Sequence, residues 1–290
     1  MSTYRIIDTF PEFLDDWESV KGKPVETKID HWTSIYGGRW PELLEKQLDN
    51  YASDGEDWRE TARSRVFPYY DQRLTSMRMA HNGLLSQCPS VYSQAVERLQ
   101  LDCDILFVIY AGIGCGAGWA TTYRNTPAVL FGLENIAEEG WETPPVLAGL
   151  IAHEIGHIDH TGRRKHKGLP ELAGPWWDTY LEGYAQYCEQ AILGRGSWHM
   201  AGASGWLEWC QSHRSWLAAE FIRSAELGNT KSFFGSWFNI LGYKQTGYYL
   251  GHEVICAIKA EESLPLARIA LLKDIAIVKE ETNKIAMGII

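Results

Sequence analysis

Two histidines four residues apart, with a glutamate directly after the first, are the residues of this chain best suited to do chemistry. His153-Glu154-Ile155-Gly156-His157 fits the HExxH pattern and lies in an apolar stretch with helical spacing. Residues four apart share one face of a helix, so both imidazoles can reach a single ion. Zinc binds histidine nitrogen at about 2.0–2.1 Å and lowers the pKa of a bound water to about 7. The pattern therefore predicts one Zn²⁺ held by His153 and His157, with Glu154 as general base.

A catalytic zinc site needs a third protein ligand that leaves one position open for water. Glu182 is the favoured candidate, because it lies on a second predicted helix and two His plus one Glu is a known catalytic zinc set. The small residues Gly183 and Ala185 would let this helix approach the HExxH helix closely. His160 and His166 are the alternatives, although His166 lies among basic residues, where we expect a solvated side chain.

Other polar residues are candidates for supporting roles. A zinc-bound histidine usually donates its second N–H to a carboxylate or a carbonyl, and Asp178 or Asp159 could accept it. Peptide hydrolysis builds an oxyanion that needs a hydrogen-bond donor besides the metal. Tyr248 and His252 are four residues apart and could both face the metal from a late helix.

The helices that carry these residues have recognisable ends. Thr143 can cap the HExxH helix, and the two prolines after it suit a first turn. A polar, basic loop is expected over residues 161–174. Asp178 can then cap the helix of Glu182, which Gly194 ends. Residues 247–260 are predicted to form the late helix.

The rest of the chain predicts a mostly helical α+β fold with a small sheet. Apolar runs at 104–110 and 128–133 are typical of buried strands. The glycines between them form a plain loop, since the Lys-Ser/Thr ending of a phosphate loop is missing. Helical patterns also cover 41–48, 90–101 and much of the chain after residue 196, whereas 27–38 has a loop-like pattern.

The domain prediction is a helical N-terminal region over residues 1–100 and a metal-binding catalytic region over residues 101–290, which together could form one continuous domain. No linker cleanly separates the two regions. The oligomeric state is not predicted.

Composition limits the partners. The chain has 290 residues, 45% of them hydrophobic, and a net charge of −10, which argues against nucleic acid and anionic membranes as partners. No apolar run is long enough to predict a membrane span, and residues 1–10 lack the pattern of a signal peptide. Six cysteines without a CxxC pair are typical of reduced thiols, so a cytoplasmic location is expected.

Three segments in a fixed order carry a resemblance to a known family. The HExxH segment is followed by Leu181-Glu182-Gly183-Tyr184-Ala185-Gln186-Tyr187 and later by Gly247-Tyr248-Tyr249-Leu250-Gly251. This order resembles the gluzincins, zinc metallopeptidases with a glutamate third ligand, and more closely a bacterial family of predicted zinc-dependent proteases of unassigned function. The resemblance covers roughly residues 100–260.

The resemblance implies a zincin-like fold, with a short sheet over the HExxH helix. It implies that His153, His157 and Glu182 bind zinc, that Glu154 is the catalytic base, and it favours Tyr248 over His252 as the oxyanion donor. It further implies that the strand at 128–133 is the edge strand to which an extended peptide substrate adds.

The residues and the resemblance together predict a zinc-dependent hydrolase, and specifically a peptidase acting on a peptide or protein. One alternative is an interaction or regulatory protein that binds zinc without proteolysis. Another is a structural zinc site, which would need four protein ligands, with His160 as the fourth.

Overall fold

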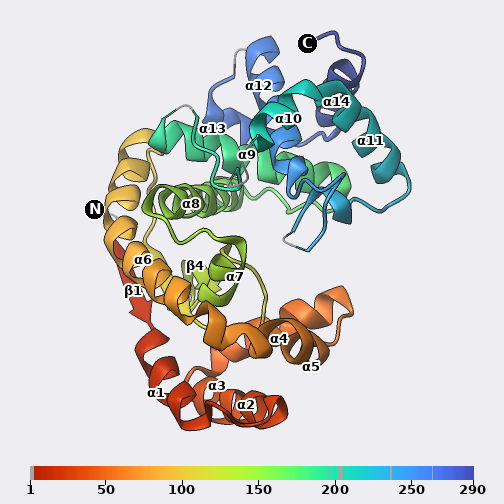
Figure 1. The fold of residues 1–290 in the computed structure, drawn as a ribbon. Helices are drawn as coiled ribbons and strands as arrows, with labels where there is room; N and C mark the ends of the chain where they lie inside the picture. Colours follow the sequence, from red (N-terminus) through yellow and green to blue (C-terminus); the bar gives the residue numbers. More distant parts are fainter. Residues whose placement is uncertain (1–2, 195, 202–204, 236, 263) are drawn as a thin grey trace. The chain divides into compact units, whose positions relative to one another are not determined.

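The computed structural model describes residues 3–194, 196–201, 205–235, 237–262 and 264–290. The chain packs as two compact units (Figure 1). The first unit contains Met1–Ser90 and Asp102–Ile151, and the second contains Val91–Leu101 and Ala152–Ile290. These units describe how the chain packs, and the sequence-based boundary at residues 100 and 101 stays a prediction.

One mixed four-stranded sheet is present among the described residues, and it belongs to the first unit. Its order is β1-β2-β4-β3, with β1 parallel to β2, β2 parallel to β4, and β3 antiparallel to β4. The strands are β1 (Tyr4–Asp8), β2 (Ile105–Tyr110), β3 (Trp119–Tyr123) and β4 (Thr126–Gly132). The mostly helical α+β class with a small sheet is thus confirmed.

The two strands predicted from apolar runs form the centre of this sheet, and the edges are strands that the sequence did not predict. Because β4 pairs with β2 on one side and β3 on the other, the expectation that residues 128–133 form an edge strand is wrong. β3 returns to β4 through Arg124 and Asn125, whose φ values of +49° and +57° are typical of a two-residue hairpin turn. Any strand addition to this sheet would therefore involve β1 or β3.

Both faces of the central strand are covered, since all six residues of β2 are buried. On one face, Val108 and Leu130 pack with Leu43 from α4 (Pro41–Asp54), a helix that begins where the sequence predicted. This burial explains why β2 is apolar throughout instead of alternating.

The other secondary-structure elements described in the first unit are helices. Besides α4, they are α1 (Phe10–Val20), α2 (Val25–His31), η1 (Trp32–Tyr36), α3 (Gly37–Arg39), α5 (Trp58–Thr61), η2 (Ala62–Val66), η3 (Phe67–Tyr69) and α7 (Leu133–Glu139). Two long helices, α6 (Tyr70–Leu99) and α8 (Pro144–His166), contribute to both units.

The loop-like interpretation of residues 27–38 is wrong, because this segment is helical from α2 to α3. Ile29, Trp32 and Tyr36 are buried at helical spacing, and Tyr36 packs edge-on against Phe13 of α1. Burial of this apolar stripe stabilises a helical segment whose composition alone does not indicate a helix.

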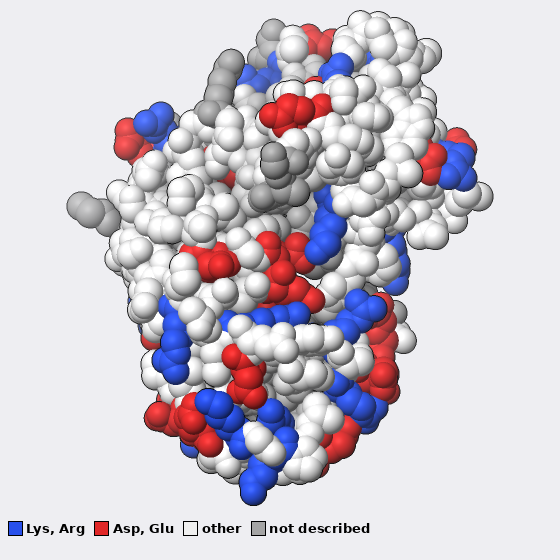
Figure 2. All heavy atoms as spheres, viewed as in Figure 1, with Lys and Arg blue, Asp and Glu red and all other residues white. Residues whose placement is uncertain are grey.

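The surface of the N-terminal helices carries both signs of charge. Figure 2 shows acidic and basic side chains intermixed on the part of the surface that α1 to α5 form. Ion pairs such as those of Arg63 with Glu26 and Arg39 with Asp16 account for part of this pattern.

The secondary-structure elements described in the second unit are helices, joined by loops. It contains α9 (Pro175–Leu193), α10 (Trp206–Ser212), α11 (Arg214–Glu226), η4 (Lys231–Phe233), α12 (Thr246–Glu262), α13 (Leu266–Ile269) and α14 (Ala276–Ala286). The helices predicted after residue 196 and over residues 247–260 are confirmed by α10, α11 and α12.

Two predicted boundaries in this unit are wrong. α9 begins at Pro175 after Gly174, so Asp178 lies inside its first turn and does not cap it, whereas Gly194 ends the helix as predicted. The loop predicted over residues 161–174 begins only after His166, because α8 continues to that residue, so most of the basic stretch is helical. Arg164 is buried there and donates hydrogen bonds to the carbonyl oxygens of Leu272 and Pro170.

Membrane crossing needs a helix of about 20 mostly apolar residues. Among the helices of the described residues, none meets the length and apolarity that a span requires.

Candidate metal centre

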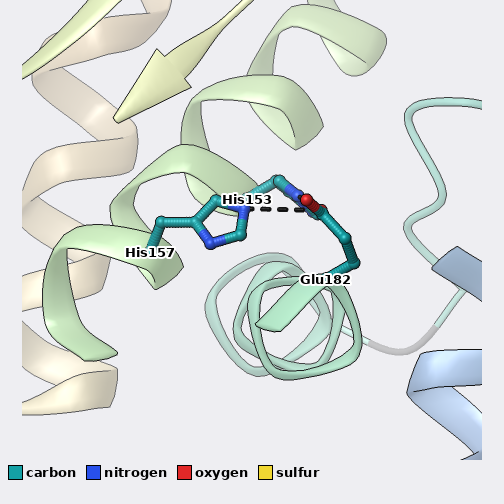
Figure 3. A group of neighbouring side chains, drawn as sticks. All are labelled: His153, His157 and Glu182. Carbon is teal, nitrogen blue, oxygen red and sulfur yellow. Dashed lines mark hydrogen bonds and ion pairs between the residues drawn. The ribbon is translucent and has the colours of Figure 1, made fainter. Parts of the chain in front are cut away.

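The three side chains expected to bind zinc lie together in the second unit. His153 and His157 face the same side of α8, and Glu182 reaches them from α9 (Figure 3). The Glu182 Oε2 atom is 3.1 Å from His153 Nε2 and 3.4 Å from His157 Nε2. Ligand atoms that surround one zinc ion as a tetrahedron lie about 3.3 Å apart. The donor set and the two distances from Glu182 are therefore compatible with a single metal ion such as zinc.

Close helix packing brings Glu182 to the histidines. Gly156 lies between the two histidines in sequence, and a Cβ atom on it would lie 2.9 Å from Ala185 Cα and 2.8 Å from Cys188 Cβ. Only glycine at position 156 allows this approach. α9 therefore lies against the HExxH turn of α8, as predicted from the small side chain of Ala185. Gly183, the other small residue, faces α12 instead: a Cβ atom on it would lie 2.2 Å from the carbonyl carbon of Gly251.

The protonation states of the three groups depend on one another. Burial lowers the pKa of His153 to about 4, so its imidazole is neutral at physiological pH. Burial alone would raise the pKa of Glu182, but the two imidazoles outweigh it and lower that pKa well below the ordinary value. Burial alone would likewise lower the pKa of His157, yet the Glu182 carboxylate raises it to about 9. A cation would take the place of the proton that His157 holds beside Glu182.

The two residues predicted to act on a substrate are close to this group. Glu154 is only 6% exposed and follows His153 on α8. The Tyr248 ring of α12 lies 5.4 Å from the His153 ring, centre to centre. Burial, followed by the charges of Glu182 and Glu154, raises the pKa of Tyr248 well above its ordinary value. The Tyr248 hydroxyl therefore keeps its proton and can donate a hydrogen bond, and its ring lies beside that of His153.

The alternative ligands and donor lie elsewhere. His160 is buried among the rings of Trp177, Tyr180 and Tyr184, and His166 is exposed at the end of α8. Neither belongs to the groups of potential metal ligands found in the described parts of the chain. His252 packs edge-on against Trp198 and pairs with Glu253.

The carboxylates expected to orient a histidine do not do so. Asp159 accepts hydrogen bonds from Tyr184 and Arg163, each at 2.7 Å. The described residues give Asp178 no hydrogen bond to either imidazole, and burial, with the charge of Glu182, raises its pKa.

A carboxylate that the sequence analysis missed lies behind His153. Glu189 and His199 form a second group of potential ligands with His153, and all three are buried. Glu189 is seven residues after Glu182, which places both on one face of α9. That spacing is the signal that could have identified it.

In comparisons with known proteins, no protein-family model, no curated protein and no solved structure matches this chain.

Proposed function

We propose that this protein is a zinc-dependent peptidase of the zincin-like type, acting on a peptide or protein substrate. The observation that carries the proposal is the position of Glu182 Oε2 between the Nε2 atoms of His153 and His157, at 3.1 Å and 3.4 Å. A set of two His and one Glu leaves one coordination position for water or substrate, as catalytic zinc sites do. The order of motifs along the chain, which resembles gluzincins, supports the same class.

The chain's own residues have distinct tasks in this proposal. A zinc ion bound by the three ligands would supply Lewis acidity and lower the pKa of a bound water. Glu154 takes a proton from the attacking water and later passes it to the leaving amine. The Tyr248 hydroxyl donates a hydrogen bond to the oxyanion that develops on the scissile carbonyl oxygen. The high pKa of Tyr248 supports this task, because the hydroxyl keeps its proton.

The packing of His160 bears on the alternative of a structural zinc site. Such a site needs four protein ligands, and the fourth candidate is enclosed by three aromatic rings. A zinc-binding interaction protein without proteolysis would use the same three ligands, so only turnover separates it from a peptidase.

The test combines metal content with cleavage. We expect the purified protein to contain about one equivalent of zinc, as a single catalytic site requires. We expect it to cleave members of a peptide library, and a chelator should stop cleavage until zinc is restored. Glu154→Gln should retain zinc and lose cleavage, because the amide cannot accept the proton. Zinc occupancy without any cleavage would favour the interaction protein, and cleavage by Glu154→Gln would reject the mechanism.

A further inference from the structure

The carboxylate of Glu189 is held in one place from several directions. Its Oε1 atom accepts hydrogen bonds from the Ser197 hydroxyl at 2.7 Å and from the backbone N–H of His199 at 3.0 Å. Its Oε2 atom is 2.7 Å from His199 Nδ1. The side chain is fully buried, yet its pKa is lowered, because the interactions with His199 outweigh the effect of burial. Glu189 is thus a fixed, ionised acceptor.

The Nδ1 side of the His153 ring, opposite the proposed metal ligand atom Nε2, faces this carboxylate. The His153 Nδ1 atom is 4.0 Å from Glu189 Oε2. It is buried and has no hydrogen-bond partner among the described residues. An imidazole that binds a metal through Nε2 carries its remaining proton on Nδ1, and that N–H then needs an acceptor.

We infer that Glu189 is a positioning residue for His153: it accepts the Nδ1–H hydrogen bond when Nε2 binds the metal, and so fixes the tautomer and orientation of this ligand. The inference rests on the metal centre proposed above and adds the residue that orients it. Closing the gap to a hydrogen bond of about 3 Å requires a shift of about 1 Å. Ser197 and His199 then act through Glu189. The segment 197–199 would thus support the metal centre without contacting the metal.

The same three residues could instead be a second metal site, and the distances argue against it. The 2.7 Å between His199 Nδ1 and Glu189 Oε2 is the length of a hydrogen bond with a proton between the atoms, and shorter than the spacing of about 3.3 Å expected for two zinc ligands. His153 would also have to bind one ion through each nitrogen and lose its last proton. One ion with an oriented histidine needs neither change.

Gln186 provides a matched control for the role of Glu189. It lies one turn earlier on α9, is also fully buried, and donates a 3.0 Å hydrogen bond to the carbonyl oxygen of Ser197. It therefore holds the same segment as Glu189 but presents no carboxylate to His153. A Gln186→Met variant loosens the segment and leaves the proposed acceptor in place.

The experiment measures zinc affinity by competition with a chelator in the full-length protein and in the Glu189→Gln and Gln186→Met variants. We expect Glu189→Gln to bind zinc about 10–100-fold more weakly, the range found when a partner of a metal-bound histidine is lost. Gln186→Met should bind with nearly wild-type affinity. Unchanged affinity in Glu189→Gln, or an equal loss in both variants, would overturn the inference. Two equivalents of zinc in the wild-type protein, falling to one in Glu189→Gln, would show a second metal site instead.

A second measurement needs no variant. Nuclear magnetic resonance of the zinc-loaded wild-type protein should show His153 bound through Nε2, with its Nδ1–H proton shifted downfield by a carboxylate acceptor. Binding through Nδ1, or an Nδ1–H signal without such a shift, would refute the role of Glu189. If the wild-type protein binds no zinc at all, the proposed metal centre itself fails, which is a distinct outcome.

Discussion

Gly183 of α9 and Gly251 of α12 approach each other so closely that no side chain fits between them. A Cβ atom on Gly183 would lie 2.2 Å from the carbonyl carbon of Gly251, and one on Gly251 would lie 2.3 Å from the carbonyl oxygen of Thr179. Glu182 directly precedes Gly183, and Tyr248 lies one turn before Gly251. This contact therefore sets the distance between the proposed carboxylate ligand and the proposed oxyanion donor.

Adding one methyl group at this contact should destabilise the protein. We expect Gly183→Ala to lower the free energy of unfolding by about 1–3 kcal/mol or more, because the clash is with backbone atoms that cannot rotate away. Gly162→Ala is the matched control, since Gly162 lies in α8 and a Cβ atom on it would meet no other atom within 4 Å. It should stabilise by about 0.5–1 kcal/mol. Urea unfolding measures both, and a Gly183→Ala variant as stable as the control would contradict this packing.

Local patterns were enough to select the three candidate ligands, because each candidate is recognised from residues within a single helix. His153, Glu154 and His157 share one turn of α8, and helical spacing alone brings the two imidazoles to one face. The prediction that Gly183 and Ala185 both let α9 approach the HExxH helix is right for Ala185 and wrong for Gly183. Ala185 contacts the HExxH turn, whereas Gly183 contacts α12, and only the assembled fold separates these roles.

The pairing of segments that lie far apart in the sequence could not be predicted from local patterns. β1 pairs with β2 across about a hundred residues, with Ile7 opposite Val108, and nothing in the first residues marks that partner. The same limit applies to Glu189. Helical spacing places Glu189 on the same face as Glu182, but the role proposed for it also depends on its hydrogen bonds with Ser197 and His199, which that spacing does not encode.

Loss of the Glu182 carboxylate should abolish tight zinc binding, whereas loss of His160 should not. We expect Glu182→Gln to weaken zinc affinity by more than about 100-fold, beyond the effect of removing an outer partner of a ligand. His160→Phe keeps an aromatic ring among Trp177, Tyr180 and Tyr184 and should leave the affinity unchanged. Chelator competition gives both values. A large loss in His160→Phe would instead indicate a four-ligand structural site.

Removing the hydroxyl of Tyr248 should affect turnover and spare the metal. With a peptide that the wild-type protein cleaves, we expect Tyr248→Phe to lower kcat by about 100-fold, the effect of losing one oxyanion donor. Its zinc affinity should be unchanged. Tyr249→Phe is the control, because the next ring along α12 packs against Trp198 and Trp206 instead. Equal kcat values for the two variants would exclude Tyr248 from the reaction.

A buried carboxylate in the first unit should make stability depend on pH. Glu134 of α7 is fully buried, and its two oxygens accept the backbone N–H groups of Gly112 and Gly114. Burial outweighs these hydrogen bonds and raises the pKa of Glu134 from 4.5 to about 7. The folded protein therefore holds this proton more tightly than the unfolded chain does.

The sign of the effect follows from that difference in proton binding. Between pH 4.5 and pH 7 the folded state binds more protons than the unfolded state, so the contribution of Glu134 is complete below pH 4.5 and is lost as the pH rises to about 7. The loss is about 3 kcal/mol at 1.36 kcal/mol for each pKa unit. Glu134→Gln cannot titrate, so the stability of the wild-type protein relative to this variant should fall by about that amount between pH 4.5 and pH 7. Urea unfolding of both proteins across this range tests it, and a difference that stays constant or grows with pH would refute the prediction.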